Sequence, residues 1–198
     1  MNFLLIVCGN SGTGKRTISK HLAQALGAVR IDADEVRRSL GKQDYDPKDA
    51  PIVLDALQKK VIEALESQES VIVHSHFRTS QKRQRFYDLG LIYGIAPILI
   101  ECHCPETIAK ERIARRPEKD ALHCPPNNPA VYDRVRQGWE DPFDDFIGKN
   151  FEVSYLRYNS ATSQITVVRT AVALQHSASL LSKIVSLLID FHPDQEHQ

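Results

Sequence analysis

A glycine-rich stretch, VCGNSGTGKRT at residues 7–17, has the composition and spacing expected of a loop that binds phosphate groups. In the pattern Gly-x-x-x-x-Gly-Lys, which ends here at Lys15, backbone N–H groups surround the anion and the lysine reaches the outer phosphates. The pattern continues with a Ser or Thr whose hydroxyl helps to hold Mg²⁺, but this chain has Arg16 there and Thr17 after it. Because Thr17 lies about 100° further round a helix, it does not replace that hydroxyl, although it could donate to an inner phosphate.

The presence of Arg16 in place of the Ser or Thr of the motif leaves the main features of the loop intact. The glycines allow a tight backbone path around an anion, and the following helix presents the positive end of its dipole. A chance match to the motif is the alternative, but the position of the loop between a buried-type strand and an amphipathic helix disfavours it. We therefore predict that the whole loop binds nucleotide phosphates. The residues assigned to this role are Asn10, Ser11, Gly12, Thr13, Gly14, Lys15, Arg16 and Thr17.

Acidic and basic residues follow in IDADEVRR, residues 31–38. A phosphoryl-transfer site needs a carboxylate that accepts or orients the proton of the substrate hydroxyl, and it gains from a cation that holds the substrate in line. Asp34 and Arg37 are three residues apart, which places them on one side of a short helix. The alternatives are that Asp32 or Asp34 caps this helix and that Arg37 belongs to a solvated face. Asp32 is the second candidate for the carboxylate.

Four short apolar runs indicate strands, and three of them are nearly continuous, as in a parallel sheet covered on both faces. They span residues 3–8, 28–31, 70–75 and 97–102. Helical patterns lie between and after them, at residues 14–26, 51–66, 80–89 and 105–116. This alternation is typical of βαβ units, whose ligands bind beyond the carboxyl ends of the strands.

The second half of the chain is less regular. Residues 115–130 are rich in proline and asparagine, which indicates a long mobile loop. A fifth strand is predicted at residues 151–158 and a terminal amphipathic helix at 177–191, whereas residues 160–175 fit no single element. We therefore expect an α/β fold of three layers, with a parallel five-stranded sheet and helices on both faces.

The motifs together resemble those of small P-loop kinases of the polynucleotide-kinase and zeta-toxin type, which occur widely as AAA-domain kinase-like proteins. The resemblance begins with CGNSGTGKRTISKHLAQALGAVRIDADEVRRSL at residues 8–40, runs through residues 71–77 and 111–116, and ends near Phe146. The sequence Gly-Lys-x-Thr is also similar to that of adenylate-kinase-type loops, so Arg16 does not disqualify the loop.

The resemblance implies a P-loop NTPase fold and an ATP-dependent kinase that uses Mg²⁺. Such a kinase transfers the γ-phosphoryl group to a hydroxyl of a small metabolite or nucleotide. In this chain Lys15 would act on the phosphates, Asp34 would be the base and Arg37 would hold the substrate. The metal is expected near Thr17, Asp32 or Asp34.

The resemblance also implies a lid at about residues 105–140, whose Arg112 and Arg116 meet the transferring phosphoryl group. The alternative is an exposed basic helix face. At the tip of the third strand the family has Asp where this chain has His74. A histidine is not a hard oxygen ligand for Mg²⁺, but it could donate to a phosphate or to the substrate. His74 is therefore a substrate-binding candidate, with a packed histidine as the alternative.

The composition fits a single domain, residues 1–198, in a reducing compartment. There are 25 Lys plus Arg and 25 Asp plus Glu residues, so no overall field attracts nucleic acid or a membrane. A local basic cleft for nucleic acid remains possible. The 4 cysteines form no recognisable disulfide framework, which favours the cytoplasm, and no apolar run approaches the length of a membrane span.

Two function classes remain. The first is the kinase, with a nucleotide and a small hydroxyl substrate as its ligands. The second is a catalytically impaired nucleotide-binding P-loop module, in which Arg16 and His74 mark the loss of turnover. Neither the phosphoryl acceptor nor the oligomeric state is indicated by a motif.

Overall fold

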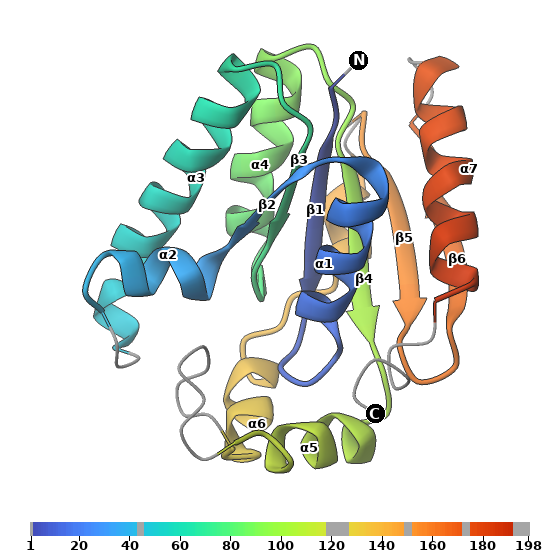
Figure 1. Cartoon of the computed structure of the whole chain (residues 1–198). Coiled ribbons are helices and arrows are strands. Elements are labelled where there is room, and N and C mark those ends of the chain that lie inside the picture. The colour runs from blue at the N-terminus through green and yellow to red at the C-terminus, as the bar shows by residue number, and fades with distance from the viewer. Residues whose placement is uncertain (1, 43–45, 118–126, 149–151, 172–174, 192–198) are drawn as a thin grey trace.

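The computed structural model describes residues 2–42, 46–117, 127–148, 152–171 and 175–191 (Figure 1). The elements in chain order are β1 (Leu4–Gly9), α1 (Lys15–Leu26), β2 (Val29–Asp32), α2 (Ala33–Ser39), the short 3-10 helix η1 (Pro47–Asp49), α3 (Ala50–Glu66), β3 (Val71–His74), α4 (Ser80–Ile92), β4 (Ile98–His103), α5 (Glu106–Ala114), α6 (Ala130–Arg136), the 3-10 helix η2 (Pro142–Phe146), β5 (Ser154–Asn159), β6 (Gln164–Arg169) and α7 (Gln175–Ile189). Within these residues, no helix combines the length and apolar character that crossing a membrane requires.

The described residues form one six-stranded sheet in the order β2-β3-β1-β4-β5-β6. Neighbouring strands from β2 to β5 are parallel, and β6 pairs with β5 in the antiparallel direction. The expected α/β class and its parallel core are therefore confirmed, but the predicted number of five strands is wrong.

The additional strand, β6, lies at the edge of the sheet and follows β5 through a tight turn. Ser163 in this turn has a φ of 54°, in the left-handed region. The side chains of β6 are half-buried or exposed, so the strand lacks the continuous apolar run that marks the buried strands. Its β-branched residues favour a strand, but pairing with β5 decides the conformation.

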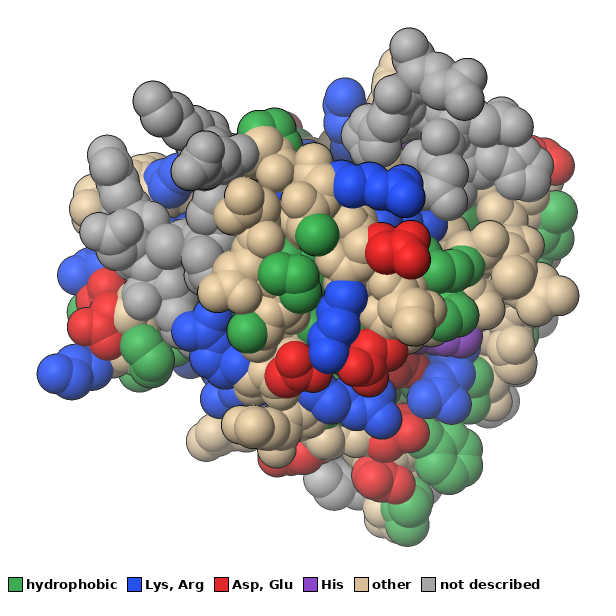
Figure 2. All heavy atoms as spheres, turned by 90° about the horizontal axis from the view of Figure 1, so that it is seen from below, with side chains coloured by type: hydrophobic (Ala, Val, Ile, Leu, Met, Phe, Trp, Pro, Cys, Tyr) green, Lys and Arg blue, Asp and Glu red, His purple; other side chains and the backbone are tan. Residues whose placement is uncertain are grey.

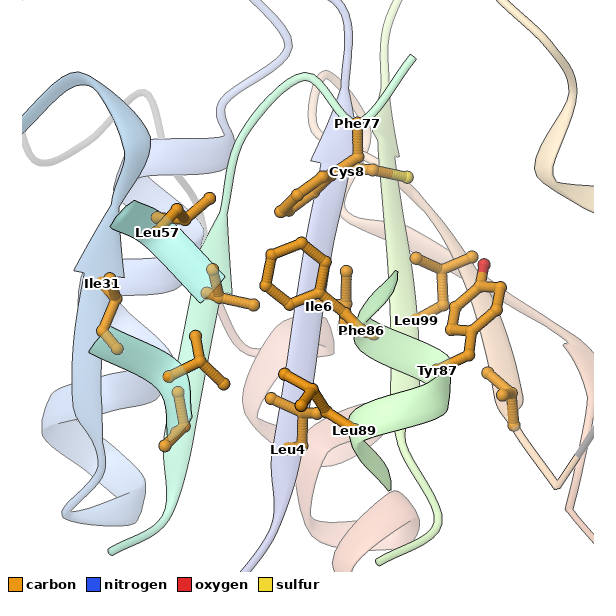
Figure 3. Close-up of a cluster of buried hydrophobic side chains, with 14 of the residues drawn as sticks. Leu4, Ile6, Cys8, Ile31, Leu57, Phe77, Phe86, Tyr87, Leu89 and Leu99 are labelled. Atoms are coloured by element: carbon orange, nitrogen blue, oxygen red, sulfur yellow. The ribbon is translucent and has the colours of Figure 1, made fainter. Parts of the chain in front are cut away.

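Two apolar layers cover the sheet, and alternate residues of β1 point into them. Leu4, Ile6 and Cys8 belong to a cluster with α3 and α4, which Figure 3 shows around Phe86. The residues between them pack on the opposite face against α1 and α7. This arrangement confirms helices on both faces and explains why the sequence of β1 is apolar throughout.

The carboxyl ends of the parallel strands meet at one edge of the sheet, and α5 and α6 lie beyond that edge (Figure 1). A separate small cluster of buried residues joins these two helices. The predicted loop at residues 115–130 falls partly outside the described residues, since 118–126 are not described, and α6 begins at its end. The elements expected to flank a ligand are thus gathered at one end of the molecule.

Candidate functional site

Three glycines shape the loop between β1 and α1. Gly9, Gly12 and Gly14 have φ values of 146°, 76° and 84°, a region that favours glycine. Larger residues would also collide with the backbone. A Cβ on Gly9 would lie 2.3 Å from the carbonyl oxygen of Cys102, and one on Gly12 would lie 2.3 Å from that of Ala109. The loop is therefore packed tightly against the end of β4 and against α5.

Hydrogen bonds from its own side chains hold the loop in shape. The carbonyl oxygen of Asn10 accepts from the Thr13 hydroxyl at 2.8 Å and from the Lys15 ammonium at 2.7 Å. The Asn10 amide group donates to the carbonyl of Tyr132 in α6 at 3.1 Å, and its oxygen accepts from the backbone N–H of Ser11 at 2.7 Å. These contacts place Lys15 across the loop to which it belongs.

The surroundings of Lys15 are poorly solvated and positively charged. Burial, together with the charge of Arg116, lowers the pKa of Lys15 to about 8. Burial also lowers the pKa of His76 well below its usual value, and the charges of Lys15 and Arg116 add to that effect. The Nε2 of this neutral histidine lies 3.1 Å from the Ser11 hydroxyl. A bound anion would relieve the positive potential at this place.

Asp32 holds a buried ion cluster at the end of β2. Its Oδ2 lies 2.8 Å from Arg16, 3.2 Å from Arg30 and 3.1 Å from His74 Nε2. Its Oδ1 accepts from the backbone N–H of Asp34 at 2.8 Å, so that Asp32 also caps α2. Burial alone would raise the pKa of Asp32, but the hydrogen bond from His74 and the charge of Arg16 outweigh it and hold the pKa far below its usual range.

His74 is buried beside this carboxylate. Burial lowers the pKa of His74 despite the nearby charge of Asp32, so the ring is neutral at pH 7. Its Nε2 donates to Asp32, and its Nδ1 lies 2.9 Å from the Ser19 hydroxyl in α1. Both ring nitrogens thus have partners within the protein, and a direct contact of His74 with a substrate stays a prediction.

The predicted pair of Asp34 and Arg37 lies on one side of α2, where their charged groups are 3.7 Å apart. The side chain of Asp34 is 41% exposed, whereas that of Arg37 is 7% exposed. Arg37 also donates to the carbonyl of Lys42 at 2.8 Å. Arg16 approaches the same carboxylate from α1, with Nη2 3.5 Å from Asp34 Oδ2. Asp34 is thus the accessible carboxylate of the site, and Asp32 is the buried one.

The two arginines predicted to act on phosphates are placed differently. Arg112 of α5 donates to the hydroxyl of Ser160 at 2.8 Å and to its carbonyl at 3.1 Å. Ser160 follows β5 and lies beside the loop, because a Cβ on Gly14 would come within 3.2 Å of its Cβ. The charge of Arg116 acts on Lys15. Arg112 therefore lies beside the loop, and the charge of Arg116 is felt there.

Sequence reasoning missed several residues of this site. Arg30 and Ser19 carried no motif, and their roles depend on the pairing of β2 with β3 and the packing of α1 on the sheet. Ser160 fell in the segment that fitted no single element. His76 lies two residues after His74 at the end of β3, and that spacing was the one available signal for it.

The side chains of Asp32 and Asp34 do not fit an Mg²⁺ ion, whereas a metal near Thr17 stays a prediction. This metal prefers hydroxyl and carboxylate oxygens, but the residue after Lys15 is Arg16. Both oxygens of Asp32 have partners, and Asp34 lies beside two guanidinium groups. Among the described residues, no three His, Cys, Asp or Glu side chains are grouped so that they could hold a metal ion.

The surface at this end of the molecule carries charges of both signs. Figure 2 views it from below and shows Lys and Arg side chains interleaved with Asp and Glu side chains. Ion pairs join β2, α1 and α2 at the carboxyl ends of the strands. Such a surface can hold the negative groups of a ligand beside a proton acceptor.

Comparison with known families finds one family model that matches the part of the chain carrying the candidate site. The model of the AAA domain family matches residues 4–135, which include the loop, the cluster around Asp32, and α5. The chain belongs to the AAA domain family. No curated protein gives a significant match.

Solved structures similar to this AAA domain chain include three kinases by name. A "putative kinase" from Chloroflexus aurantiacus is 29% identical over 71% of this chain and 82% of its own, with a TM-score of 0.58. A gluconokinase from Sinorhizobium meliloti is 20% identical over 94% of this chain and 91% of its own, with a TM-score of 0.54. The APS kinase of Mycobacterium tuberculosis, in complex with AMPPNP and APS, is 15% identical over 93% of this chain and 98% of its own, with a TM-score of 0.57. The last two show that the fold is shared.

Proposed function

We propose that this chain is an ATP-dependent kinase that transfers the γ-phosphoryl group of ATP to a hydroxyl of a small metabolite or nucleotide. The glycine loop with Lys15 held across it is the observation that carries the proposal. The similar structures that are named kinases support it, as does membership of the AAA domain family. The proposed unit is the single domain of residues 1–198. Free thiols at Cys8, Cys102 and Cys104 support a reducing compartment, the cytoplasm.

The proposed roles follow the charges and the exposure of the side chains. Residues 10–17 enclose the phosphates, and Lys15, Arg112 and Arg116 stabilise the charge that spreads over the transferring phosphoryl group. Asp34 is the proposed base, because its carboxylate is accessible while that of Asp32 is buried. It accepts the proton of the attacking hydroxyl.

Two further residues position this reaction. Arg37 lies 3.7 Å from Asp34 and is the proposed clamp on the substrate. His74 holds Asp32 at the start of α2. His74 therefore supports the helix that carries both the base and the clamp.

A nucleotide-binding module without turnover is the second candidate. Arg16 and His74 favour this candidate, because they stand where the resembled kinases have a hydroxyl residue and a carboxylate residue. Both candidates predict nucleotide binding, and they differ in phosphoryl transfer.

A screen for transfer to hydroxyl compounds tests the proposal. We expect ADP formation from ATP to depend on one class of acceptor among sugars, nucleosides, amino sugars and 5′-hydroxyl oligonucleotides, with and without Mg²⁺. Asp34→Asn should reduce the rate at least a hundredfold while the protein still binds ATP. Asp46→Asn, which changes an exposed carboxylate, should leave it unchanged.

Two results would contradict the kinase. A rate that survives Asp34→Asn would remove Asp34 from its role. ATP binding that depends on Lys15, with no transfer to any acceptor class, would favour the binding module instead.

A further inference from the structure

Two carboxylates hold the guanidinium of Arg16, the residue at the sequence position where the phosphate motif has a metal-binding hydroxyl. Its Nε donates to Asp32 at 2.9 Å, and its Nη2 lies 2.8 Å from Asp32 and 3.5 Å from Asp34. The side chain is 24% exposed, so it is neither sealed in the core nor extended into solvent. A planar group held by two carboxylates has a defined orientation. Arg16 is thus a fixed positive charge next to Lys15 in the sequence.

The carboxylates around Arg16 are already balanced by positive charges. Each one contacts at least one guanidinium group, and the buried one also accepts from His74. The charged groups of this cluster are Asp32, Asp34, Glu35, Arg16, Arg30 and Arg37. A divalent cation would add two positive charges to a cluster whose three carboxylates face three guanidinium groups. Magnesium therefore competes with arginine side chains for the carboxylates here.

We propose that the Arg16 guanidinium takes the place of the divalent cation, so that the site binds a nucleoside triphosphate in its metal-free form and disfavours the Mg²⁺ complex. This inference rests on the nucleotide site proposed above. A guanidinium suits the role, since it carries a permanent charge whose position the two carboxylates fix. A magnesium ion already on the phosphates would be repelled by the same group.

Calorimetric titration with ATP tests the proposal, because it predicts the sign of the metal effect. One series contains EDTA and the other contains Mg²⁺ in excess over ATP, at the same ionic strength. We expect the apparent Kd to be at least tenfold higher with Mg²⁺, since most of the ATP is then in the disfavoured complex. An apparent Kd that is unchanged or lower with Mg²⁺ overturns the proposal.

Variants at residue 16 assign the effect to the guanidinium. Arg16→Ser supplies the hydroxyl of the motif and removes a positive charge beside Asp34, so the Kd should no longer rise with Mg²⁺. Arg16→Lys keeps the charge and should keep a rise, which covers the case in which the serine variant does not fold. Arg115→Ser removes a guanidinium from a side chain that is 80% exposed just after α5, and this variant should behave as the wild type does. A rise in folded Arg16→Ser as large as in the wild type also overturns the proposal.

Failure of the underlying nucleotide site has a different signature. If folded wild-type protein binds ATP neither with EDTA nor with Mg²⁺, the nucleotide site itself is refuted, and the inference falls with it. If ATP binds and Mg²⁺ strengthens the binding, the site stands and only the role of Arg16 is refuted.

Discussion

Asp32 is the residue that holds together three parts of the candidate site. It caps α2, receives Arg16 from α1, and accepts from His74 of β3. Its side chain is 1% exposed, and the pKa of its carboxyl is far below the usual range. A buried carboxylate with this many charged partners stabilises the fold only as long as it remains ionised.

We expect Asp32→Asn to lower the free energy of unfolding by about 3 kcal/mol at pH 7, because it leaves two guanidinium groups and His74 without their anion. Asparagine still caps a helix, so the loss reports the charge. The pKa of Asp32 is lower in the folded protein than in the unfolded chain. The difference between variant and wild type should therefore be full at neutral pH and shrink as the pH falls below about 4.

Urea unfolding at several pH values measures this difference. The control is Asp46→Asn, which alters an exposed carboxylate that caps η1 and should change the stability by less than about 0.5 kcal/mol. An Asp32→Asn variant as stable as the wild type at pH 7 would show that the ion cluster is not a stabilising centre.

The sequence predicts local pairs of residues better than distant ones. Asp34 and Arg37 were expected on one helix side, and they lie there, because three residues make nearly one helical turn. The contacts of Asp32 with Arg16 and His74 were not predicted. Arg16 is 16 positions from Asp32 in the chain, and His74 is 42 positions from it. Only the order of the strands brings these residues together.

The glycine loop and α5 form a second structural unit, in which backbone atoms meet directly. Gly12 faces the carbonyl of Ala109 so closely that a Cβ would lie 2.3 Å from the oxygen. Gly27 at the end of α1 has a similar positive φ, 64° against 76°, but nothing lies within 4 Å of its Cβ position. An alanine at Gly27 would therefore strain only the backbone, whereas an alanine at Gly12 would also collide with α5.

We expect Gly27→Ala to cost about 1 kcal/mol of unfolding free energy, since only the left-handed backbone is strained. Gly12→Ala should cost more and should also weaken ATP binding at least tenfold, because α5 or the loop must move. Thermal unfolding and calorimetric titration measure the two effects. Equal stability and equal ATP affinity of the two variants would contradict the close packing of the loop on α5.

The strands up to β5 and the helices α1, α3, α4, α5 and α7 were predicted, whereas α6 and β6 were not. The buried strands and the helices α1, α3 and α7 follow from continuous or periodic apolar residues. The short helix α6 begins at Ala130, the last residue of the predicted loop, and β6 is an edge strand without a buried run. Both depend on packing with neighbouring elements, which the local sequence does not specify.

At the scale of the whole molecule, the site lies at the carboxyl ends of the strands, while α7 covers one face of the sheet. The packing of α7 involves α1, because Nε2 of His21 lies 3.3 Å from the carbonyl oxygen of Leu187. Just after α7, Phe191 stacks on the His21 ring at a centroid distance of 4.0 Å. Leu188 on α7 is fully buried, whereas the neighbouring Ile189 is 52% exposed. Stability and ligand binding should therefore be separable by changes on α7.

Leu188→Ala should lower the free energy of unfolding by about 2–5 kcal/mol through the cavity that it leaves. ATP affinity, measured well below the unfolding temperature, should stay within about twofold, because Leu188 is not among the residues around the loop. Ile189→Ala on the same helix should change the stability by less than about 0.5 kcal/mol. A large loss of affinity in folded Leu188→Ala would instead show that α7 and the loop are coupled.

The layered architecture was predictable because the pattern that produces it recurs along much of the chain. Apolar strands followed by amphipathic helices leave few alternatives to a parallel sheet covered on both faces. The charge balance around the loop was not predictable, since the net charge of zero says nothing about which residues meet at the strand ends. The interleaved charges in Figure 2 depend on the fold itself.

Amide hydrogen exchange of residues 10–15, measured with and without ATP, tests the central claim most directly. If the backbone N–H groups of this loop enclose the phosphates, ATP should slow their exchange, and adenosine at the same concentration should not. If ATP leaves the exchange of these amides unchanged, or protects only other segments of the chain, the loop is not the phosphate site and the kinase proposal fails.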